Sequence, residues 1–207
     1  MLGTLLGWQP GGLGLEFSKD QRYNLELNKG QRRFCVNILI ILGTAREGRY
    51  SDKVAGFVSS VLKAEQIVNE IIDVRDYRLA ASDNSEESLQ AKKLAEKVVK
   101  ADALIIVMPE YNHGYPGELK MMFDLLYGQY NGKVIGLCGV SKGPLGGARG
   151  LQALKLTLAS VGAVPVIENV YFSNVQQLFD EKGVIKDPAY ESRVKGLLKG
   201  ISARLKR

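Results

Sequence analysis

Residues 34–51 read FCVNILIILGTAREGRYS, an apolar run that ends in a polar loop containing glycine, threonine and arginine. The run at 34–42 is rich in Ile, Leu and Val, and its continuous apolarity is typical of a strand buried on both faces. Two later runs, at 103–108 and 134–140, have the same character. The sequence therefore predicts at least three strands at the centre of one sheet.

Segments with the period of an amphipathic helix separate and follow these runs. Gly162 is predicted to end the fourth of these helices, and Asp187 and Pro188 are predicted to be the N-cap and first residue of the fifth. Each segment indicates only that one face of a helix packs against a sheet. Apolar residues recur three and four positions apart in 54–62, 91–99, 119–127, 151–161 and 194–201.

Repeated strand–helix–strand units require parallel strands and right-handed crossovers. Glu70 and Asp73 make the second candidate strand polar and Pro165 lies in the fifth, so both are predicted to be edge strands. This pattern predicts a flavodoxin-like α/β fold, a doubly wound, five-stranded parallel sheet of order 2-1-3-4-5 with helices on both faces. Its ligand is expected beyond the carboxyl ends of strands 1, 3 and 4. The candidate strands lie near 35–42, 68–74, 103–109, 133–140 and 164–170.

Residues 1–33 differ from the rest, because they are glycine-rich at first and then of mixed charge with no clear period. We interpret them as an extension that is disordered or packs on another subunit, and we place the folded domain at 34–207. Residues 1–15 carry no charge and lack the continuous apolar core of a signal peptide. The longest apolar run is about half of the roughly 20 residues that a membrane-spanning helix needs. We therefore expect a cytoplasmic protein without membrane insertion.

The composition, with 45% hydrophobic and 24% charged residues, is that of an ordinary globular chain and argues against disorder, collagen-like repeats and coiled coils. The net charge of +6 is compatible with nucleic acid, an anionic membrane, a phosphorylated small molecule or simply a solvated surface. No recognition motif for nucleic acid accompanies the charge, so we expect no nucleic-acid partner. Cys35 and Cys138 lie in apolar runs rather than at metal-ligand spacing, and we interpret both as buried free thiols in a reducing compartment.

The first polar loop runs from strand 1 into a helix whose predicted N-cap is Ser51. Such a turn directs backbone N–H groups and the positive end of a helix dipole toward one place. Thr44, Arg46 and Ser51 add hydroxyl and guanidinium donors there, and Arg49 is expected to assist Arg46. The loop is therefore a candidate phosphate site.

Two alternatives compete with this interpretation. Gly43 and Gly48 have the spacing of a nucleoside-triphosphate loop, but Arg49 and Tyr50 replace the Lys and Ser/Thr that this motif needs, which disfavours triphosphate hydrolysis. A polar turn without any ligand is the second alternative. Asp52, an acid beside the proposed anion site, favours that second alternative.

The second loop, PEYNHGYPG at 109–117, combines turn formers with aromatic residues. Such a loop can present backbone polar groups and a stacking face to a flat polar ring. His113 is the only histidine, and because the sequence shows no partner for it, we interpret it as structural rather than as an acid or base. The glycines of the third loop, SKGPLGGARG at 141–150, allow a ligand or a neighbouring chain to approach closely or serve as simple turns.

Together the three loops resemble those of the NADPH-dependent FMN reductase family, which comprises flavodoxin-like quinone and azo reductases. The resemblance covers about residues 35–205. Residues 1–33 fall outside it, and MMFD at 121–124 stands where such proteins often have Asn-Ala-Ile/Leu-Asp. The motifs that carry it are GTAR at 43–46, PEYN at 109–112, PGELK at 116–120 and GGAR at 146–149.

This resemblance implies a bound FMN, with NADPH or NADH as a transient co-substrate. Each loop would contact a different part of the flavin. The phosphate would be held by Thr44, Arg46 and Ser51, the ribityl chain and isoalloxazine edge by Pro109, Glu110, Tyr111 and Asn112, and the pyrimidine side by Ser141, Lys142 and Gly143.

The implied reaction is a ping-pong hydride transfer from NAD(P)H to the flavin and on to a small acceptor such as a quinone, azo compound, metal oxyanion or free flavin. No side chain is expected to be catalytic, because the flavin carries the chemistry. The resemblance also implies a homodimer or homotetramer. The alternative function is that of a flavodoxin-type electron carrier for protein partners, but flavodoxins are usually acidic and lack an arginine such as Arg46 in the phosphate loop.

Overall fold

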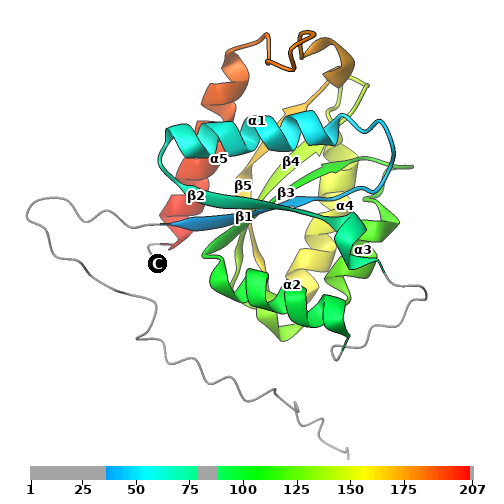
Figure 1. Ribbon diagram of the computed structural model, residues 1–207, viewed down its shortest axis with the longest axis vertical. Coiled ribbons are helices and arrows are strands. Elements are labelled where there is room, and N and C mark those ends of the chain that lie inside the picture. Colours follow the sequence, from blue (N-terminus) through cyan, green and yellow to red (C-terminus); the bar gives the residue numbers. More distant parts are fainter. Residues whose placement is uncertain (1–35, 79–87, 206–207) are drawn as a thin grey trace, which may run out of the picture. The chain divides into compact units, whose positions relative to one another are not determined.

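The computed structural model describes residues 36–78 and 88–205, which contain a five-stranded parallel sheet (Figure 1). The strand order is β2-β1-β3-β4-β5, which confirms the predicted topology and both predicted edge strands. Residues 1–33 and Cys35, for which we predicted an extension and a buried thiol, lie outside the described residues. The strands are β1 (Asn37–Leu42), β2 (Val68–Asp73), β3 (Ala103–Pro109), β4 (Val134–Val140) and β5 (Val164–Phe172).

The three central strands are buried along almost their whole length, whereas most residues of β2 and β5 are exposed or half-buried. Continuous apolar runs form central strands because helices cover both sides of a parallel sheet. Leu42 pairs with Val107, and Pro109 pairs with Val140. The loops that follow β1, β3 and β4 therefore leave the sheet at the same end, where the carboxyl ends of these strands lie.

Helices cover both faces of the sheet, as predicted (Figure 1). Successive residues of β1 alternate between two cores, with Ile40 packed in the core beneath α1 and α5 and Ile41 in the core beneath α2, α3 and α4. Cys138 is free and buried, which confirms its predicted state. The helices are α1 (Ser51–Ala64), α2 (Leu89–Lys100), α3 (Gly117–Phe123), α4 (Ala148–Ser160) and α5 (Ala189–Leu205), with short 3₁₀ turns η2 (Val74–Tyr77), η3 (Gly128–Tyr130) and η4 (Val175–Gln177).

Two predicted helix ends are confirmed. Gly162 has a φ of 69°, and its N–H bonds to the carbonyl of Ala159 while Ala163 N–H bonds to that of Leu158, the paired bonds of a Schellman end. Asp187 Oδ1 accepts a bond of 2.9 Å from the Ala189 N–H and so caps α5 as predicted, although the helix begins at Ala189, one residue after the predicted Pro188. No helix within residues 36–78 and 88–205 is both long and apolar enough to cross a membrane.

Two other helix predictions are wrong. Ser51 is the first residue of α1 rather than its N-cap, because Tyr50 in the cap position already has helical angles (φ −76°, ψ −14°). The helix predicted through 119–127 stops at Phe123. Leu125 and Leu126 then bond to carbonyls three residues back, which keeps both side chains buried and leaves Tyr127 exposed. A short helix followed by tight turns satisfies the same apolar spacing as a longer helix.

Candidate functional site

A pocket of about 330 Å³ lies beyond the carboxyl ends of β1, β3 and β4. This volume falls at the lower end of the range of about 300–1,000 Å³ that is typical of small-molecule sites. All three loops singled out in the sequence contribute to its wall. The predicted contact residues that line it are Arg46, Ser51, Pro109, Glu110, Tyr111, Ser141 and Lys142.

The first loop brings a cation and backbone donors to this pocket that have no partner in the described part of the chain. The Arg46 side chain is exposed and forms no ion pair within the described part of the chain. Tyr50 makes no side-chain capping bond, and the N–H groups of residues 51–53 find no acceptor among the described residues. The first turn of a helix carries partial positive charge on such N–H groups. This donor set suits an anionic group.

Thr44 does not line the pocket. Its side chain is fully buried, and its hydroxyl lies 2.9 Å from the hydroxyl of Tyr111. This bond joins the first loop to the second, so Thr44 supports a residue of the pocket wall from behind. Its contact with a flavin phosphate stays a prediction.

The second loop folds back in a tight turn between Tyr111 and Gly114, whose N–H and carbonyl groups exchange bonds of 3.0 and 2.9 Å. Asn112 and His113 between them have φ values of 48° and 65°, as a type I′ turn requires. Asn tolerates this left-handed region better than most residues. Asn112 is exposed at the tip of the turn and does not line the pocket, so its flavin contact also stays a prediction.

Glu110 has a structural partner that the sequence did not reveal. Its Oε2 accepts bonds from the N–H groups of Arg149 (3.0 Å) and Gly150 (3.2 Å) in the first turn of α4. The N-cap residue of α4 is Gly147, which has no side chain to do this. Glu110 therefore caps α4 from another loop and couples the second loop to the third.

The third loop packs closely against its own chain. A Cβ on Gly146, whose φ is 59°, would lie 2.7 Å from the Cβ of Tyr171 in β5. A Cβ on Gly139 would overlap the carbonyl oxygen of Gly146. The closeness of β5 thus requires a glycine at position 146, and the closeness of the third loop requires a glycine at position 139 of β4. Near the pocket, Ser141 Oγ accepts a bond of 3.0 Å from the Gly143 N–H, but Gly143 itself does not line the pocket.

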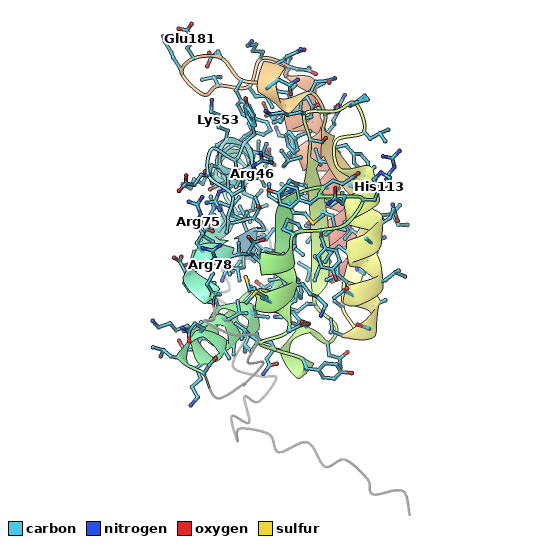
Figure 2. All side chains as sticks on the ribbon, turned by 90° about the vertical axis from the view of Figure 1, so that its right-hand side faces the viewer. Arg46, Lys53, Arg75, Arg78, His113 and Glu181 are labelled. Atoms are coloured by element: carbon cyan, nitrogen blue, oxygen red, sulfur yellow. The ribbon has the colours of Figure 1, made fainter. Side chains whose placement is uncertain are left out.

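Lys142 and His113 lie at the rim of the loops. Lys142 Nζ lies 5.6 Å from the ring centroid of Tyr50, which joins the third loop to the first by a cation–π contact. His113 Nε2 lies 3.1 Å from Arg149 Nη1 and does not line the pocket. Figure 2 shows Arg46 beside α1 and His113 beside α4. The structural role expected for His113 fits this position and stays a prediction.

Arg49 lines the pocket beside Arg46, but its guanidinium is already bonded to other groups, and its assistance at the anion stays a prediction. Only 5% of the Arg49 side chain is exposed, and every nitrogen of its guanidinium has a partner. Nε donates to Asp52 at 2.7 Å, Nη1 donates to Asp73 at 3.0 Å and to the Thr44 carbonyl, and Nη2 donates to Asp73. Asp52, which favoured a turn without ligand, is thus an ion partner of Arg49 in the first turn of α1.

This pairing shifts the pKa values of both groups. Partial burial alone would lower the pKa of Arg49, but the bonds to Asp73 and Asp52 outweigh it and raise that pKa. Partial burial alone would raise the pKa of Asp73, but the bonds from Arg49 and from the Arg75 N–H outweigh it and lower that pKa. Both groups are therefore charged at neutral pH.

A second hollow of about 580 Å³ lies against Arg78 and the start of α3. It borders the point where the described part of the chain is interrupted, at residues 79–87, and neither the first nor the third loop lines it. We therefore assign no site to it.

The chain matches known flavoenzymes over the same region. The sequence model of the NADPH-dependent FMN reductase family matches residues 36–177. The chain is 30% identical to a quinone reductase of Escherichia coli K12, over 69% of this chain and 79% of that protein. It is 28% identical to a quinone reductase of Pseudomonas putida, over 73% of this chain and 85% of that protein.

A flavoenzyme NAD(P)H:(acceptor) oxidoreductase from Paracoccus denitrificans has the same fold, with a TM-score of 0.70 at 21% identity over 82% of this chain and 98% of that one. These matches confirm the predicted family resemblance, with its FMN cofactor and NAD(P)H-dependent reductase activity. The span 36–177 includes all three loops of the pocket, and the chain belongs to the NADPH-dependent FMN reductase family.

Proposed function

We propose that the pocket beyond β1, β3 and β4 holds FMN and that NAD(P)H and a small electron acceptor use this site in turn. The observation that carries the proposal is the meeting of three loops, distant in sequence, around one pocket. At the end formed by the first loop, the pocket has the unpaired N–H groups of α1 and the unpaired guanidinium of Arg46 among the described residues. Anions bind well at such helix starts.

Each loop has a separate task in this proposal. Arg46, Ser51 and the first turn of α1 bind the flavin phosphate. Residues 109–111 border the ribityl chain and one edge of the ring, while Ser141 and Lys142 border the pyrimidine side. Thr44 acts through Tyr111, because its hydroxyl bonds to that residue behind the pocket wall.

Bound FMN supplies the hydride and electron transfer, and the chain binds and orients it. Of the two carboxylates that line the pocket, Glu110 is committed to the start of α4 and Glu47 is exposed. Neither is paired with a histidine in the described structure, since His113 contacts Arg149. We therefore propose a mechanism without an essential side-chain acid or base.

The identity of the acceptor, the assembly and the compartment also belong to this proposal. We propose a small acceptor such as a quinone, an azo compound, a metal oxyanion or free flavin, as the family resemblance implies. Leu156 on α4 and Ile167 on β5 are each 78% exposed, and association into a homodimer or homotetramer would remove such apolar surface from water. A monomer by light scattering would contradict the assembly.

The compartment that we propose is the cytoplasm. The free thiol of Cys138 is compatible with this reducing compartment.

Absorption spectroscopy of the purified chain tests the cofactor and the activity in one experiment. We expect the yellow bands of oxidised flavin and their prompt loss when NADPH is added without oxygen. A yellow protein whose bands persist with both NADPH and NADH would favour the alternative, a flavodoxin-type carrier that receives electrons from protein partners. A colourless chain that does not take up added FMN would contradict the proposal.

A further inference from the structure

We propose that Arg49, Asp73 and Arg75 form a clamp that orients the backbone of the first loop and thereby makes the pocket select for the flavin phosphate. This inference rests on the proposed function and concerns residues that bond to the first loop itself; Arg49 also lines the pocket, whereas Asp73 and Arg75 do not. The clamp contacts three consecutive carbonyl groups, those of residues 44–46. Arg49 Nη1 donates to the first, Arg75 Nε donates to the second at 3.1 Å, and Arg75 Nη2 donates to the third at 2.9 Å.

Asp73 anchors both arginines to the sheet. Its carboxylate accepts two bonds from the Arg49 guanidinium and one bond of 2.9 Å from the backbone N–H of Arg75. Asp73 is the last residue of β2 and pairs in register with Leu42, the last residue of β1. The clamp therefore fixes a loop to two paired strands rather than to another loop.

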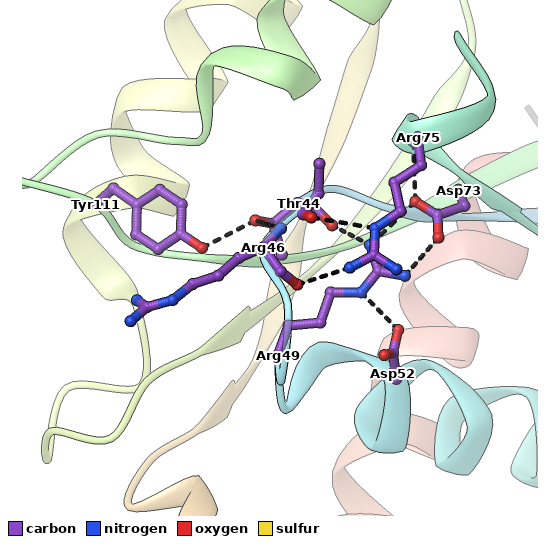
Figure 3. Close-up of polar contacts among 8 residues, drawn as sticks. Thr44, Arg46, Arg49, Asp52, Asp73, Arg75 and Tyr111 are labelled. Carbon is purple, nitrogen blue, oxygen red and sulfur yellow. Dashed lines mark hydrogen bonds and ion pairs between the residues drawn. The ribbon is translucent and has the colours of Figure 1, made fainter. Parts of the chain in front are cut away.

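The carbonyl bonds determine where the N–H groups of the loop point. No cis peptide occurs among the described residues, and in a trans peptide the N–H points away from the C=O. Because the carbonyls of residues 44–46 face the clamp, the N–H groups of residues 45–47 face the opposite side. The Arg46 N–H bonds there to Thr44 Oγ1 at 3.4 Å, while those of Ala45 and Glu47 have no acceptor among the described residues. Figure 3 shows the Arg46 side chain and the Tyr111 ring on that opposite side, away from Arg49 and Arg75. Successive N–H groups on one side form a concave anion site.

The clamp acts by orientation rather than by its own charge. Arg49 and Arg75 are matched by Asp73 and Asp52, which leaves the four residues without net charge. The Arg49 guanidinium also has all three nitrogens bonded. Arg49, Asp73 and Arg75 are therefore positioning residues, and the bonds to the phosphate come from the backbone and from Arg46.

Comparing FMN with riboflavin isolates the phosphate, because the two share the same ring and ribityl chain. The full-length chain is stripped of flavin and titrated with each compound, as wild type and as Asp73→Asn. We expect Asp73→Asn to weaken FMN binding by about tenfold or more, by analogy with the loss when a group that orients metal ligands is removed, and to change riboflavin binding by less than about twofold. Glu70→Gln is the matched control. Glu70 lies on β2, as Asp73 does, and forms an ion pair with Lys97, so the substitution also removes one paired carboxylate. It should change neither the Kd for FMN nor the Kd for riboflavin.

Arg75→Ala provides a second variant in case Asp73→Asn fails to fold. Arg75 is exposed, and its removal deletes two carbonyl bonds without touching the Arg49–Asp73 pair. We expect a loss of FMN affinity in the same direction, again without loss of riboflavin affinity. Equal losses of FMN and riboflavin in these variants, or no loss of either, would overturn the clamp. A wild-type chain that binds neither flavin would overturn the proposed function as well. Tight binding of FMN by wild type, with the ratio of the two Kd values unchanged in the variants, would overturn the clamp alone.

Discussion

The first and third loops of the pocket are held in place by different kinds of interaction. The first is fixed by side chains, since Arg49 and Arg75 bind its carbonyls and Asp73 binds both arginines. The third is fixed by the absence of side chains, since Gly139 and Gly146 allow its backbone to lie against β4 and β5. The difference predicts separate weaknesses, because charge and pH should affect the first loop and added volume should affect the third.

The largest expected effect is that of Gly139→Ala in β4. A Cβ at this position meets the carbonyl oxygen of Gly146, which is backbone and cannot rotate away. We expect a loss of about 3 kcal/mol in the free energy of unfolding, at the upper end for added volume in a packed site, measured by urea denaturation. Both FMN and riboflavin should bind more weakly, because the third loop would shift under the ring.

Gly143→Ala is the control for this prediction. It adds the same methyl group within the third loop, but its nearest neighbour would be Ser141 Oγ at an ordinary 3.5 Å. We expect a change of less than about 0.5 kcal/mol, as for surface substitutions. A Gly139→Ala chain as stable as Gly143→Ala would show that the third loop is not held by close backbone packing.

The next effect concerns the charge that the first loop presents to the pocket. Arg46→Ala removes a charged donor from the proposed phosphate site, and hydrogen bonds to charged groups contribute about 1.5–3 kcal/mol. We therefore expect FMN to bind roughly tenfold to a hundredfold more weakly, with little change for riboflavin, by fluorescence titration. Lys53→Ala removes an equal charge from the exposed face of α1, where Nζ lies 6.0 Å from the Phe179 ring centroid, and should leave the Kd for FMN nearly unchanged. Equal losses in both variants would indicate a general effect of charge.

A smaller effect, and a dependence on pH, is expected for the stability of the clamp. The pKa of Asp73 in the folded chain lies below its usual value of 3.8, so its carboxylate stabilises the fold at all pH values above 3.8. This contribution is lost as the pH falls from 3.8 through the lowered pKa. We expect Asp73→Asn to be less stable than wild type by about 1–2 kcal/mol at pH 7, between the values for exposed and buried ion pairs.

The difference between wild type and Asp73→Asn should stay constant from neutral pH down to about pH 5 and shrink below 3.8. Urea denaturation of both chains across this range measures it. The glycine variants provide the contrast, since the destabilisation by Gly139→Ala should not vary with pH. A stability difference for Asp73→Asn that grows in acid would contradict the direction of the Asp73 pKa shift.

The sequence predicted the strand order and the pocket because these depend on local patterns. Continuous apolar runs identify central strands, polar runs identify edges, and parallel strands place their loops at one end of the sheet. The bonds behind the pocket depend instead on register between strands. Asp73 lies 24 positions from Arg49, and only the pairing of β1 with β2 brings them together. No spacing rule connects such residues, so the sequence did not reveal that the Arg49 guanidinium is bonded to Asp73.

The glycines of the third loop illustrate the same limit. A glycine-rich loop is compatible with a ligand, a neighbouring chain or tight packing on its own chain. The contacts of Gly146 with Tyr171 favour the last of these, but they follow from the position of β5 and not from the loop sequence. Glu110 is similar, since its carboxylate caps a helix that begins 38 residues later, at Ala148.

The smallest expected effect tests the link between the second and third loops. His113→Ala should lower the flavin-saturated reductase rate by less than about tenfold, whereas loss of a general acid or base usually costs about a hundredfold to ten-thousandfold. His113 contacts Arg149 and has a φ of 65°. The substitution therefore removes one bond and forces alanine into a left-handed conformation that alanine rarely adopts. His113→Asn separates these causes, because Asn tolerates that conformation but cannot replace an imidazole in proton transfer. Recovery of the rate in His113→Asn would assign the effect to the shape of the turn. A loss of more than about a thousandfold in both variants would make His113 catalytic and would contradict a mechanism without an essential side-chain acid or base.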